Sequence, residues 1–312
     1  MARLLHILVL FFLSITGMFT VHTFAYVAPP LRIQPQATVL FGGDMMFDRT
    51  IRTTIDQKGG DFIFSCIDPT LQGSDIVVAN LEGPITATSS RSVGSAIAAP
   101  DNYVFTFPTT TAPLLAAHHI GVINLGNNHI LNFGSDGVRS TESALTDAGV
   151  RYFGDPLVQT VAVTSVHGIS LAFINYNEFE PSSTASTTVA QIRQAKASGE
   201  IPVVYTHWGI EYATTSPEYV HVLAHEFVDA GASIVIGSHP HVVEDHEVYN
   251  GANIYYSLGN FIFDQYWSDA VTHGLMLQVT LGTSGVQTVK EIPVVLQHDR
   301  RTCPVVSSVN PV

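Results

Sequence analysis

Short apolar runs recur along this chain, and five of them are followed at once by a residue that can bind a metal. The runs are rich in Val and Ile and are bounded by Gly or Pro, which predicts buried β-strands. They occupy residues 39–43, 76–81, 122–127, 203–206 and 234–238. The residues that follow them are Asp44, Glu82, Asn128 with His129, His207, and His239 with His241. Ligands bind beyond the carboxyl ends of strands in open α/β sheets, so the pattern predicts one rim with carboxylate, amide and imidazole groups. These groups are the ligands expected of a divalent metal centre.

Helical segments alternate with these strands. Five stretches have the pattern of a helix: residues 46–57, 111–119, 136–148, 189–197 and 217–230. In the second half, three pairs of strands flank a glycine-containing turn, as hairpins do: residues 161–166 with 169–176, 247–249 with 253–257, and 276–281 with 287–295. The βα alternation together with antiparallel hairpins predicts an α/β fold of two mixed sheets rather than one doubly wound sheet.

The N-terminal region differs from the rest of the chain. From Leu4 to Val27 there is no acidic or basic residue apart from two histidines, which is typical of a secretory signal peptide or of an N-terminal membrane anchor. Small residues at 23 and 25 would suit cleavage after Ala25. Either form implies export, with the protein secreted, membrane-anchored or otherwise at the cell surface. We predict a leader at 1–27, a proline-containing linker at 28–36, a folded domain at 37–298 and a C-terminal tail at 299–312.

The net charge of the chain limits the classes of partner that it can bind. The chain has 13 Lys+Arg against 26 Asp+Glu and a formal net charge of -13, which argues against a nucleic-acid partner because phosphate contacts need a basic surface. An anionic substrate stays compatible, since a bound cation can reverse the local field. Two cysteines, Cys66 and Cys303, make no disulfide framework, and a single bridge between them is left open.

Six segments in their order resemble the CapA type capsule-synthesis (poly-γ-glutamate) family. They are residues 43–49, 79–84, 127–129, 207–212, 237–242 and 257–265, and the resemblance runs from about 38 to 265. One such segment alone would be a weak signal, but six in sequence are specific. That family is similar to the calcineurin-like metallophosphoesterases, so the resemblance implies an αββα sandwich with one or two divalent metal ions, such as Mn, Zn, Fe or Mg.

The resemblance also implies roles for the residues at the rim. The first metal would be held by Asp44 and His241, the second by Asn128, His207 and His239, with Glu82 as the bridging carboxylate and His129 as the acid for the leaving group. Two cations about 3.5–4 Å apart clamp a phosphoryl oxygen and generate hydroxide from water. Residues expected to support the ligands or contact substrate are Arg49, Asn80, Asn132, Glu211, Tyr212 and Asn260, although a structural role suits Glu211 and Tyr212 equally well.

Some histidines have simpler interpretations. His239 and His241 are alternate residues, which point the same way in extended chain unless the backbone turns. His221 and His225 lie four apart on one predicted helix and could bind zinc. The apolar stripe of that helix leaves them near the surface, so we interpret them as solvated.

The chain departs from the related families at two positions. Metallophosphoesterases usually have a histidine two residues after the first aspartate, where this chain has Met46, a poor ligand for hard cations. The capsule family commonly has an aspartate three residues after the motif histidine, where this chain has Asn132. A missing carboxylate there would weaken His129 as an acid.

These residues favour an exported metal-dependent hydrolase of capsule or poly-γ-glutamate synthesis or attachment. The alternatives are a non-catalytic assembly or polymer-binding module on the same fold, and a secreted phosphodiesterase or nucleotidase. The expected partners are an anionic polymer such as poly-γ-glutamate or another cell-envelope substrate, and membrane-bound capsule-synthesis proteins.

Overall fold

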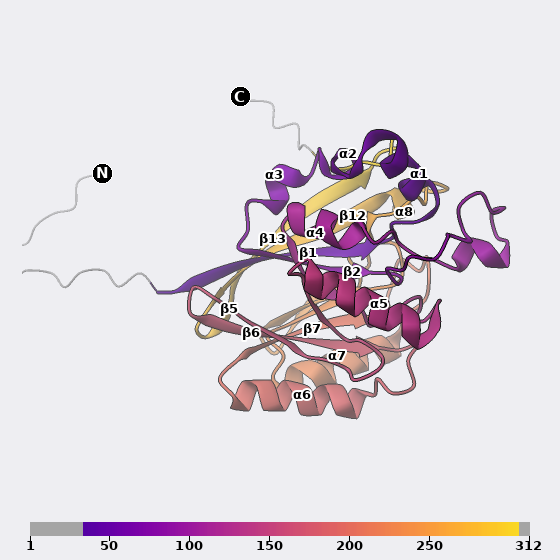
Figure 1. The fold of residues 1–312 in the computed structure, drawn as a ribbon. Coiled ribbons are helices and arrows are strands. Elements are labelled where there is room, and N and C mark those ends of the chain that lie inside the picture. Colours follow the sequence, from indigo (N-terminus) through magenta and orange to yellow (C-terminus); the bar gives the residue numbers. More distant parts are fainter. Residues whose placement is uncertain (1–33, 306–312) are drawn as a thin grey trace, which may run out of the picture. The chain divides into compact units, whose positions relative to one another are not determined.

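The strands assemble into two mixed sheets in the computed structural model, which describes residues 34–305 (Figure 1). The first sheet has eight strands in the order β14-β13-β12-β1-β2-β3-β4, with β11 also paired to β1. β1 to β4 and β11 run parallel, whereas β12 to β14 are antiparallel. The bounds are β1 Gln36–Met45, β2 Ile76–Leu81, β3 Ile120–Asn124, β4 Arg151–Phe153, β11 Asn260–Ile262, β12 His273–Gly282, β13 Gly285–Leu296 and β14 Thr302–Pro304.

The second sheet has six strands in the order β5-β6-β7-β8-β10-β9. Its central strands are parallel and its two edge strands, β5 and β9, are antiparallel parts of the predicted hairpins. The bounds are β5 Ala162–Val166, β6 Ile169–Asn177, β7 Ile201–His207, β8 Ile234–Ser238, β9 His246–Tyr249 and β10 Ala252–Tyr255. Parallel strands with antiparallel hairpins in both sheets confirm the predicted mixed architecture.

Helices cover the outer faces of the sheets (Figure 1). Those in the first half of the chain lie over the first sheet, and α6 and α7 lie over the second. The bounds are α1 Arg49–Lys58, α2 Gly60–Phe64, α3 Asp68–Leu71, α4 Thr111–Ala117, α5 Gly134–Asp147, α6 Ala185–Ala197, α7 Glu218–Ala230 and α8 Asp269–Thr272, with a 3₁₀ turn at Pro100–Tyr103.

Strand residues alternate between neighbouring cores, as the pleat of a strand requires. In β1, Leu40 faces the core under α1 to α5, whereas Val39 and Phe41 face the core between the two sheets. A third core packs β6 to β8 against α6 and α7, with Trp208 and Phe227 at its centre. The order is therefore helices, sheet, sheet, helices, which is the αββα sandwich that the resemblance implied.

The ends differ in part from the sequence-based boundaries. The predicted leader and most of the linker lie outside the described residues. At the other end, the sheet continues to β14 inside the segment predicted as a tail, and Cys303 of β14 forms a disulfide with Cys66. Among the residues that the structure describes, none of the helices combines the length and apolarity that a membrane span would need.

Removing the Cys66–Cys303 disulfide should lower stability. The bridge ties the last strand to the segment before α3 across 237 residues of sequence, so it restricts the unfolded chain strongly. We expect Cys66→Ser to cost roughly 2–5 kcal/mol of unfolding free energy. Thermal melting with and without a reductant measures this: the reductant should lower the melting temperature of the wild type and leave that of the variant unchanged. Equal melting temperatures for both proteins under oxidising conditions would contradict the prediction.

Candidate metal centre

The carboxyl ends of β1 and β2 place Asp44 and Glu82 side by side. The backbone of β1 passes very close to the turn before β11, since a Cβ on Gly43 would lie 1.9 Å from the carbonyl oxygen of Gly259. Only glycine fits there. Asp44 N then donates to that same carbonyl at 3.1 Å, and Glu82 N donates to the Met45 carbonyl at 2.9 Å. Backbone contacts thus fix both carboxylates at one rim.

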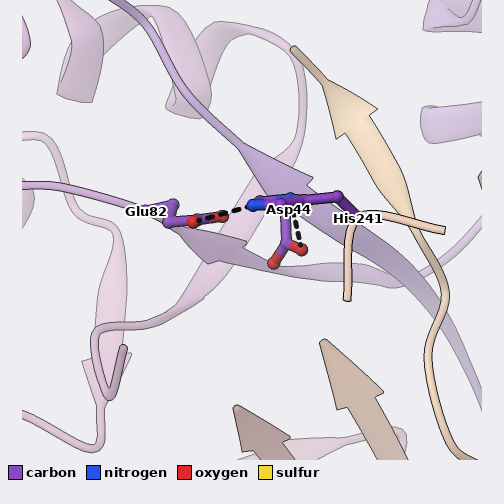
Figure 2. Close-up of side chains that lie close together, drawn as sticks. All are labelled: Asp44, Glu82 and His241. Carbon is purple, nitrogen blue, oxygen red and sulfur yellow. Dashed lines mark ion pairs between the residues drawn. The ribbon is translucent and has the colours of Figure 1, made fainter. Parts of the chain in front are cut away.

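Asp44, Glu82 and His241 form a first cluster, the Asp44 group (Figure 2). All three are buried, and their ligand atoms lie within 4.8 Å of one another. His241 Nδ1 is 3.4 Å from Asp44 Oδ2, and His241 Nε2 is 3.5 Å from Glu82 Oε1. Two ligands of one ion with bonds of 2.0–2.2 Å are at most about 4.4 Å apart, so small shifts would let the group hold a cation.

Glu82 is the residue whose environment most favours a cation. Its side chain is fully buried, and neither carboxylate oxygen has a hydrogen-bond partner within residues 34–305. A buried carboxylate without partners is costly in free energy. Burial raises the pKa of Glu82 well above its usual value, His241 opposes this rise and Asp44 adds to it. A cation among these three side chains would satisfy both oxygens.

Asn260 orients the His241 ring through a hydrogen bond at Nδ1. Asn260 Nδ2 donates to Gln265 Oε1 at 2.9 Å and to the Val271 carbonyl at 3.0 Å, which leaves Oδ1 as an acceptor 3.1 Å from His241 Nδ1. This assigns a proton to Nδ1 and directs Nε2 at Glu82, as the supporting partners of metal-binding histidines do. Burial lowers the pKa of His241, but the nearby carboxylates of Glu82 and Asp44 outweigh it and raise the pKa to about 9. The Asp44 group therefore favours positive charge.

Asn128, His207 and His239 form a second cluster, the His207 group. His207 Nε2 lies 3.1 Å from Asn128 Oδ1 and 3.2 Å from His239 Nδ1. Ser238 Oγ donates to the Thr206 carbonyl at 2.8 Å, so it accepts from His207 Nδ1 at 2.9 Å. The lone pair of His207 Nε2 then faces the amide oxygen of Asn128, two acceptors in contact. Burial lowers the pKa of His207 well below its usual value and that of His239 to about 3, so both rings are neutral, as ligands must be.

Asn80 of β2 lies between the two groups. Its Nδ2 donates to Asp44 Oδ1 at 2.8 Å and lies 3.4 Å from His207 Nδ1. Together the two groups offer three oxygen and three nitrogen ligands from Asp44, Glu82, Asn128, His207, His239 and His241. This donor set fits borderline divalent cations such as Mn²⁺, Zn²⁺ or Fe²⁺.

Three further buried asparagines hold Asn80 in place, and the sequence-based site omitted them. Asn80 Oδ1 accepts from Nδ2 of Asn124 at 3.0 Å and from Nδ2 of Asn127 at 3.1 Å. Asn175 Nδ2 donates in turn to Asn124 Oδ1 at 2.9 Å. Asn124 and Asn127 interrupt the apolar run 122–127, and a polar residue inside a buried strand was the available signal, because it must find a partner.

The backbone turns sharply at His239 and His241. Their φ angles are 102° and 59°, in the left-handed region that non-glycine residues rarely adopt. The two rings therefore enter different groups instead of pointing the same way, as an extended chain would make them. The turn also brings His239 N to Asp44 Oδ2 at 3.1 Å. Left-handed backbone costs about 1–3 kcal/mol per residue and persists where the surroundings require it, typically at functional sites.

His129 lies beside the Asp44 group. Its Nε2 is 3.8 Å from Glu82 Oε1, and its Nδ1 is 3.2 Å from Asn132 Oδ1. Asn132 Oδ1 also accepts from Phe105 N at 2.8 Å, so the amide is held firmly. Burial lowers the pKa of His129 to about 4, although the hydrogen bond that His129 donates to Asn132 raises it. Asn132 thus orients His129 as a carboxylate would, without adding negative charge.

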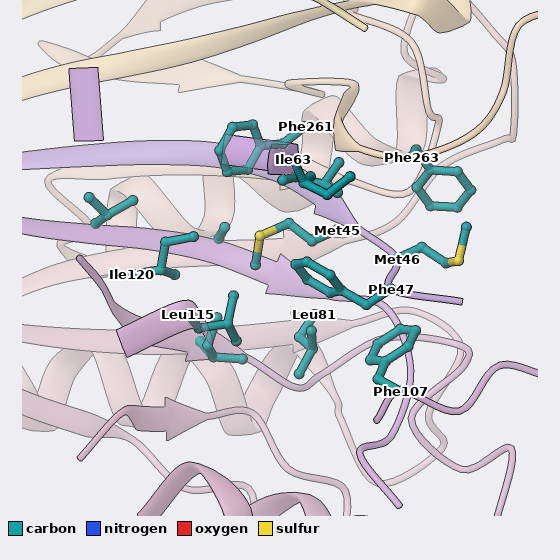
Figure 3. Close-up of a cluster of buried hydrophobic side chains, with 14 of the residues drawn as sticks. Met45, Met46, Phe47, Ile63, Leu81, Phe107, Leu115, Ile120, Phe261 and Phe263 are labelled. Carbon is teal, nitrogen blue, oxygen red and sulfur yellow. The ribbon is translucent and has the colours of Figure 1, made fainter. Parts of the chain in front are cut away.

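Met46 belongs to the hydrophobic core. It is fully buried among Phe47, Phe107 and Phe263, and its sulfur accepts from Asp48 N at 3.0 Å (Figure 3). A side chain at this position packs in the core and does not face the metal centre. The packing of Met46 therefore accounts for the departure from the metallophosphoesterase pattern.

The other residues predicted to support the ligands or contact substrate lie around the centre, and they differ in how far they are buried. Arg49 Nη2 lies 2.5 Å from Asp264 Oδ1. The half-exposed Tyr212 ring stacks 5.9 Å from that of His241, and its hydroxyl accepts from Gln265 Nε2 at 3.3 Å. Glu211 is exposed, and its charge contributes to the raised pKa of His241.

His221 and His225 are only partly solvated. His225 Nε2 lies 2.7 Å from Glu247 Oε1, and His221 Nδ1 lies 3.5 Å from the same oxygen. Their side chains are 25% and 32% exposed. The interpretation of both histidines as solvated was therefore wrong, because they lie half-buried and share Glu247 as a partner.

Known proteins resemble this chain over most of its length. Residues 38–265 match the model of the family described as bacterial capsule synthesis protein PGA_cap. The chain is 30% identical over 284 residues to PGA biosynthesis protein CapA of Bacillus subtilis (strain 168), covering 85% of this chain and 73% of that protein. It is 29% identical to capsule biosynthesis protein CapA of Bacillus anthracis, covering 86% and 69%.

Two further similarities are weaker. A probable polyglutamine synthesis accessory protein of Mycobacterium tuberculosis (strain ATCC 25618 / H37Rv) is 29% identical over 223 residues, covering 61% of this chain and 56% of that protein. A solved structure of a hypothetical protein from Thermus thermophilus aligns with a TM-score of 0.49 at 16% identity, covering 82% of this chain and 98% of that one. On the match of residues 38–265 and the identity to the Bacillus subtilis protein, the chain belongs to the PGA_cap family of bacterial capsule synthesis proteins.

Proposed function

We propose that this chain is an exported metal-dependent hydrolase that acts in capsule or poly-γ-glutamate synthesis or attachment. The observation that supports metal chemistry best is Glu82, a fully buried carboxylate whose two oxygens have no hydrogen-bond partner among the described residues. The facing acceptors of His207 and Asn128 support it independently. The biological context comes from the relatives, two of which are named for PGA or capsule biosynthesis.

Each residue of the centre has a distinct role in this proposal. Bound divalent cations supply Lewis acidity and lower the pKa of water. The Asp44 group and the His207 group hold them, and Asn80 holds Asp44 through a hydrogen bond to Oδ1. His129 exchanges a proton with the leaving group, since its Nε2 is directed at the centre. Its low pKa keeps it neutral until negative charge on a bound substrate raises that pKa.

Metal content and turnover measured on one preparation test the proposal. After mild dialysis we expect one or two divalent ions per chain, and turnover of phosphodiester or glutamyl substrates that a chelator abolishes and added Mn²⁺ or Zn²⁺ restores. A protein that retains no metal, and whose melting temperature a chelator does not change, would refute a metal centre.

A non-catalytic assembly or polymer-binding module is the second candidate. Met46 favours it, because its place in the core removes one ligand from the first metal. A protein that binds metal and glutamyl polymer but turns over no phosphoester, amide or glutamyl substrate would establish this alternative.

Asn132→Asp should raise activity on substrates with poor leaving groups. A carboxylate at this position can accept the same hydrogen bonds from Phe105 N and His129 Nδ1 while its charge raises the pKa of His129. Substitution of a hydrogen-bond partner that orients a histidine of the site typically changes activity roughly 10-fold or more. The ratio of kcat/KM for an alkyl and an aryl phosphodiester, compared between variant and wild type, measures the effect. An unchanged ratio would mean that the protonation of His129 does not limit the reaction.

Export is part of the proposal and rests on the apolar stretch from Leu4 to Val27 together with the Cys66–Cys303 disulfide. Disulfides persist mainly outside the reducing cytosol. Intact-mass analysis of the protein from its native host distinguishes cleavage after Ala25 from an uncleaved anchor. A full-length, reduced protein in the cytoplasm would contradict both forms. Proteins of the capsule-synthesis machinery in the membrane are the partners that this location would bring close.

A further inference from the structure

A cavity of about 550 Å³ lies beside the metal centre, and the proposed chemistry leaves it without a role. Its walls come from the start of α1, from the loop of residues 92–102, from the segment after β11 and from the turn between β13 and β14. The side chains that matter for its chemistry are Arg49, Asp264, Trp267 and Arg300. The volume is in the range of small-molecule sites, about 300–1,000 Å³.

On two sides of the cavity, one aromatic ring lies between a residue of the cavity wall and a histidine of the centre. The Arg49 guanidinium lies 5.1 Å from the centre of the Phe105 ring, and that ring lies 4.5 Å from His129. On the other side, the Trp267 and Tyr212 rings lie 5.3 Å apart, and Tyr212 stacks on His241. These contacts connect two walls of the cavity to His129 and His241.

The cavity carries an excess of positive charge in a protein of formal net charge -13. Arg49 and Asp264 form an ion pair, and Asp264 also accepts from Thr50 N at 3.1 Å and Thr50 Oγ1 at 2.8 Å. Arg300 differs, because it donates only to neutral oxygens, Thr50 Oγ1 at 2.8 Å and the His298 carbonyl at 2.5 Å. Within residues 34–305 no carboxylate forms an ion pair with it.

Arg300 lies in the turn between β13 and β14, where its N donates to the Gln297 carbonyl at 2.8 Å and its φ is 81°. The adjacent Arg301 is an ordinary surface arginine, with its Nη2 2.8 Å from Asp299. Two neighbouring arginines thus have different electrostatic roles, and only Arg300 lines the cavity.

We propose that this cavity is the subsite for a carboxylate-bearing polymer, with Arg300 as the group that binds a pendant carboxylate. Guanidinium binds carboxylate through two parallel hydrogen bonds, which gives both strength and orientation. Trp267, 61% exposed, offers an apolar surface to the methylene groups between successive carboxylates. A γ-linked glutamate chain combines these two features. The inference rests on the proposed function for the nature of the polymer.

The test compares Arg300→Gln with the matched control Arg301→Gln. Calorimetric titration of each metal-loaded protein with a short γ-linked glutamate oligomer should show an affinity roughly 10–100-fold lower for Arg300→Gln, the loss expected for a charge-assisted hydrogen-bonded pair. Arg301→Gln should bind as the wild type does. The same oligomer with its α-carboxylates converted to amides should bind the wild type as weakly as the acidic oligomer binds Arg300→Gln. Metal content and melting temperature confirm that each variant is folded.

Binding and turnover separate this inference from the proposed function. If the oligomer binds in an Arg300-dependent way but is not cleaved, the subsite stands and the hydrolase proposal fails. If the wild type cleaves the oligomer while Arg300→Gln changes neither its Kd nor its KM, the hydrolase stands and the subsite is overturned. Equal affinity for the acidic and amidated oligomers, or no binding by the wild type, overturns it as well.

Discussion

Replacing Glu82 by glutamine should release metal from the centre and lower turnover roughly 10²–10⁴-fold, because metal-derived stabilisation of several kcal/mol corresponds to that factor. Glutamine keeps the shape of the side chain and removes the charge that faces His241. In the metal-free protein the same substitution should change the melting temperature little, because the gain from removing a buried carboxylate without hydrogen-bond partners is offset by the loss of its ion pair with His241. Elemental analysis, turnover and melting with and without a chelator measure the three effects.

Glu244→Gln is the matched control. Glu244 is also buried, both of its oxygens are without partners in the described part of the chain, and burial raises its pKa to about 8. It lies outside both ligand groups, so its substitution should raise the melting temperature while metal content and turnover stay at the wild-type level. The assignment of Glu82 fails if Glu82→Gln keeps its metal and its turnover, or if both variants lose metal equally.

The strands that carry the centre were predictable because they are buried on both faces. Such strands are continuous apolar runs in the sequence, and the predicted runs 76–81 and 234–238 coincide with β2 and β8. β11 and β14 are three residues long, too short for a local periodicity to predict, and β11 pairs with β1, which is remote in sequence. Their positions depend on tertiary contacts, which include the disulfide at Cys303.

The resemblance implied which ligands belong together, whereas the local sequence pattern did not predict it. The order of the motifs indicated His239 and His241, but two left-handed φ angles send the rings into different groups, and apolar periodicity carries no information about such a turn. The same holds for Asn80, whose place between Asp44 and His207 depends on amide partners from β3 and β6. Arg300 is remote from Arg49 in the sequence, and only the folded chain brings both to one cavity.

His129→Ala should lower turnover roughly 10²–10⁴-fold on substrates with poor leaving groups and hardly at all on activated aryl esters. An alkoxide or amine needs a proton as it departs, whereas an aryl oxide departs without one. His129 is placed to supply that proton, with Nε2 directed at Glu82 and Nδ1 held by Asn132, and it is not one of the six ligand residues. Metal content should therefore remain at the wild-type level.

The shape of the leaving-group dependence is what identifies the acid. A plot of log kcat/KM against leaving-group pKa should be steeper for His129→Ala than for the wild type, because unassisted departure leaves more negative charge on the leaving oxygen. His118→Ala is the matched control: His118 is also buried, stacks 4.3 Å from Phe64 and pairs with Asp68, remote from both ligand groups. It should lower the melting temperature and leave the slope unchanged. Parallel plots for His129→Ala and the wild type, or metal lost with His129, would assign the imidazole to structure or metal binding instead, since neither role changes how much charge the leaving oxygen carries.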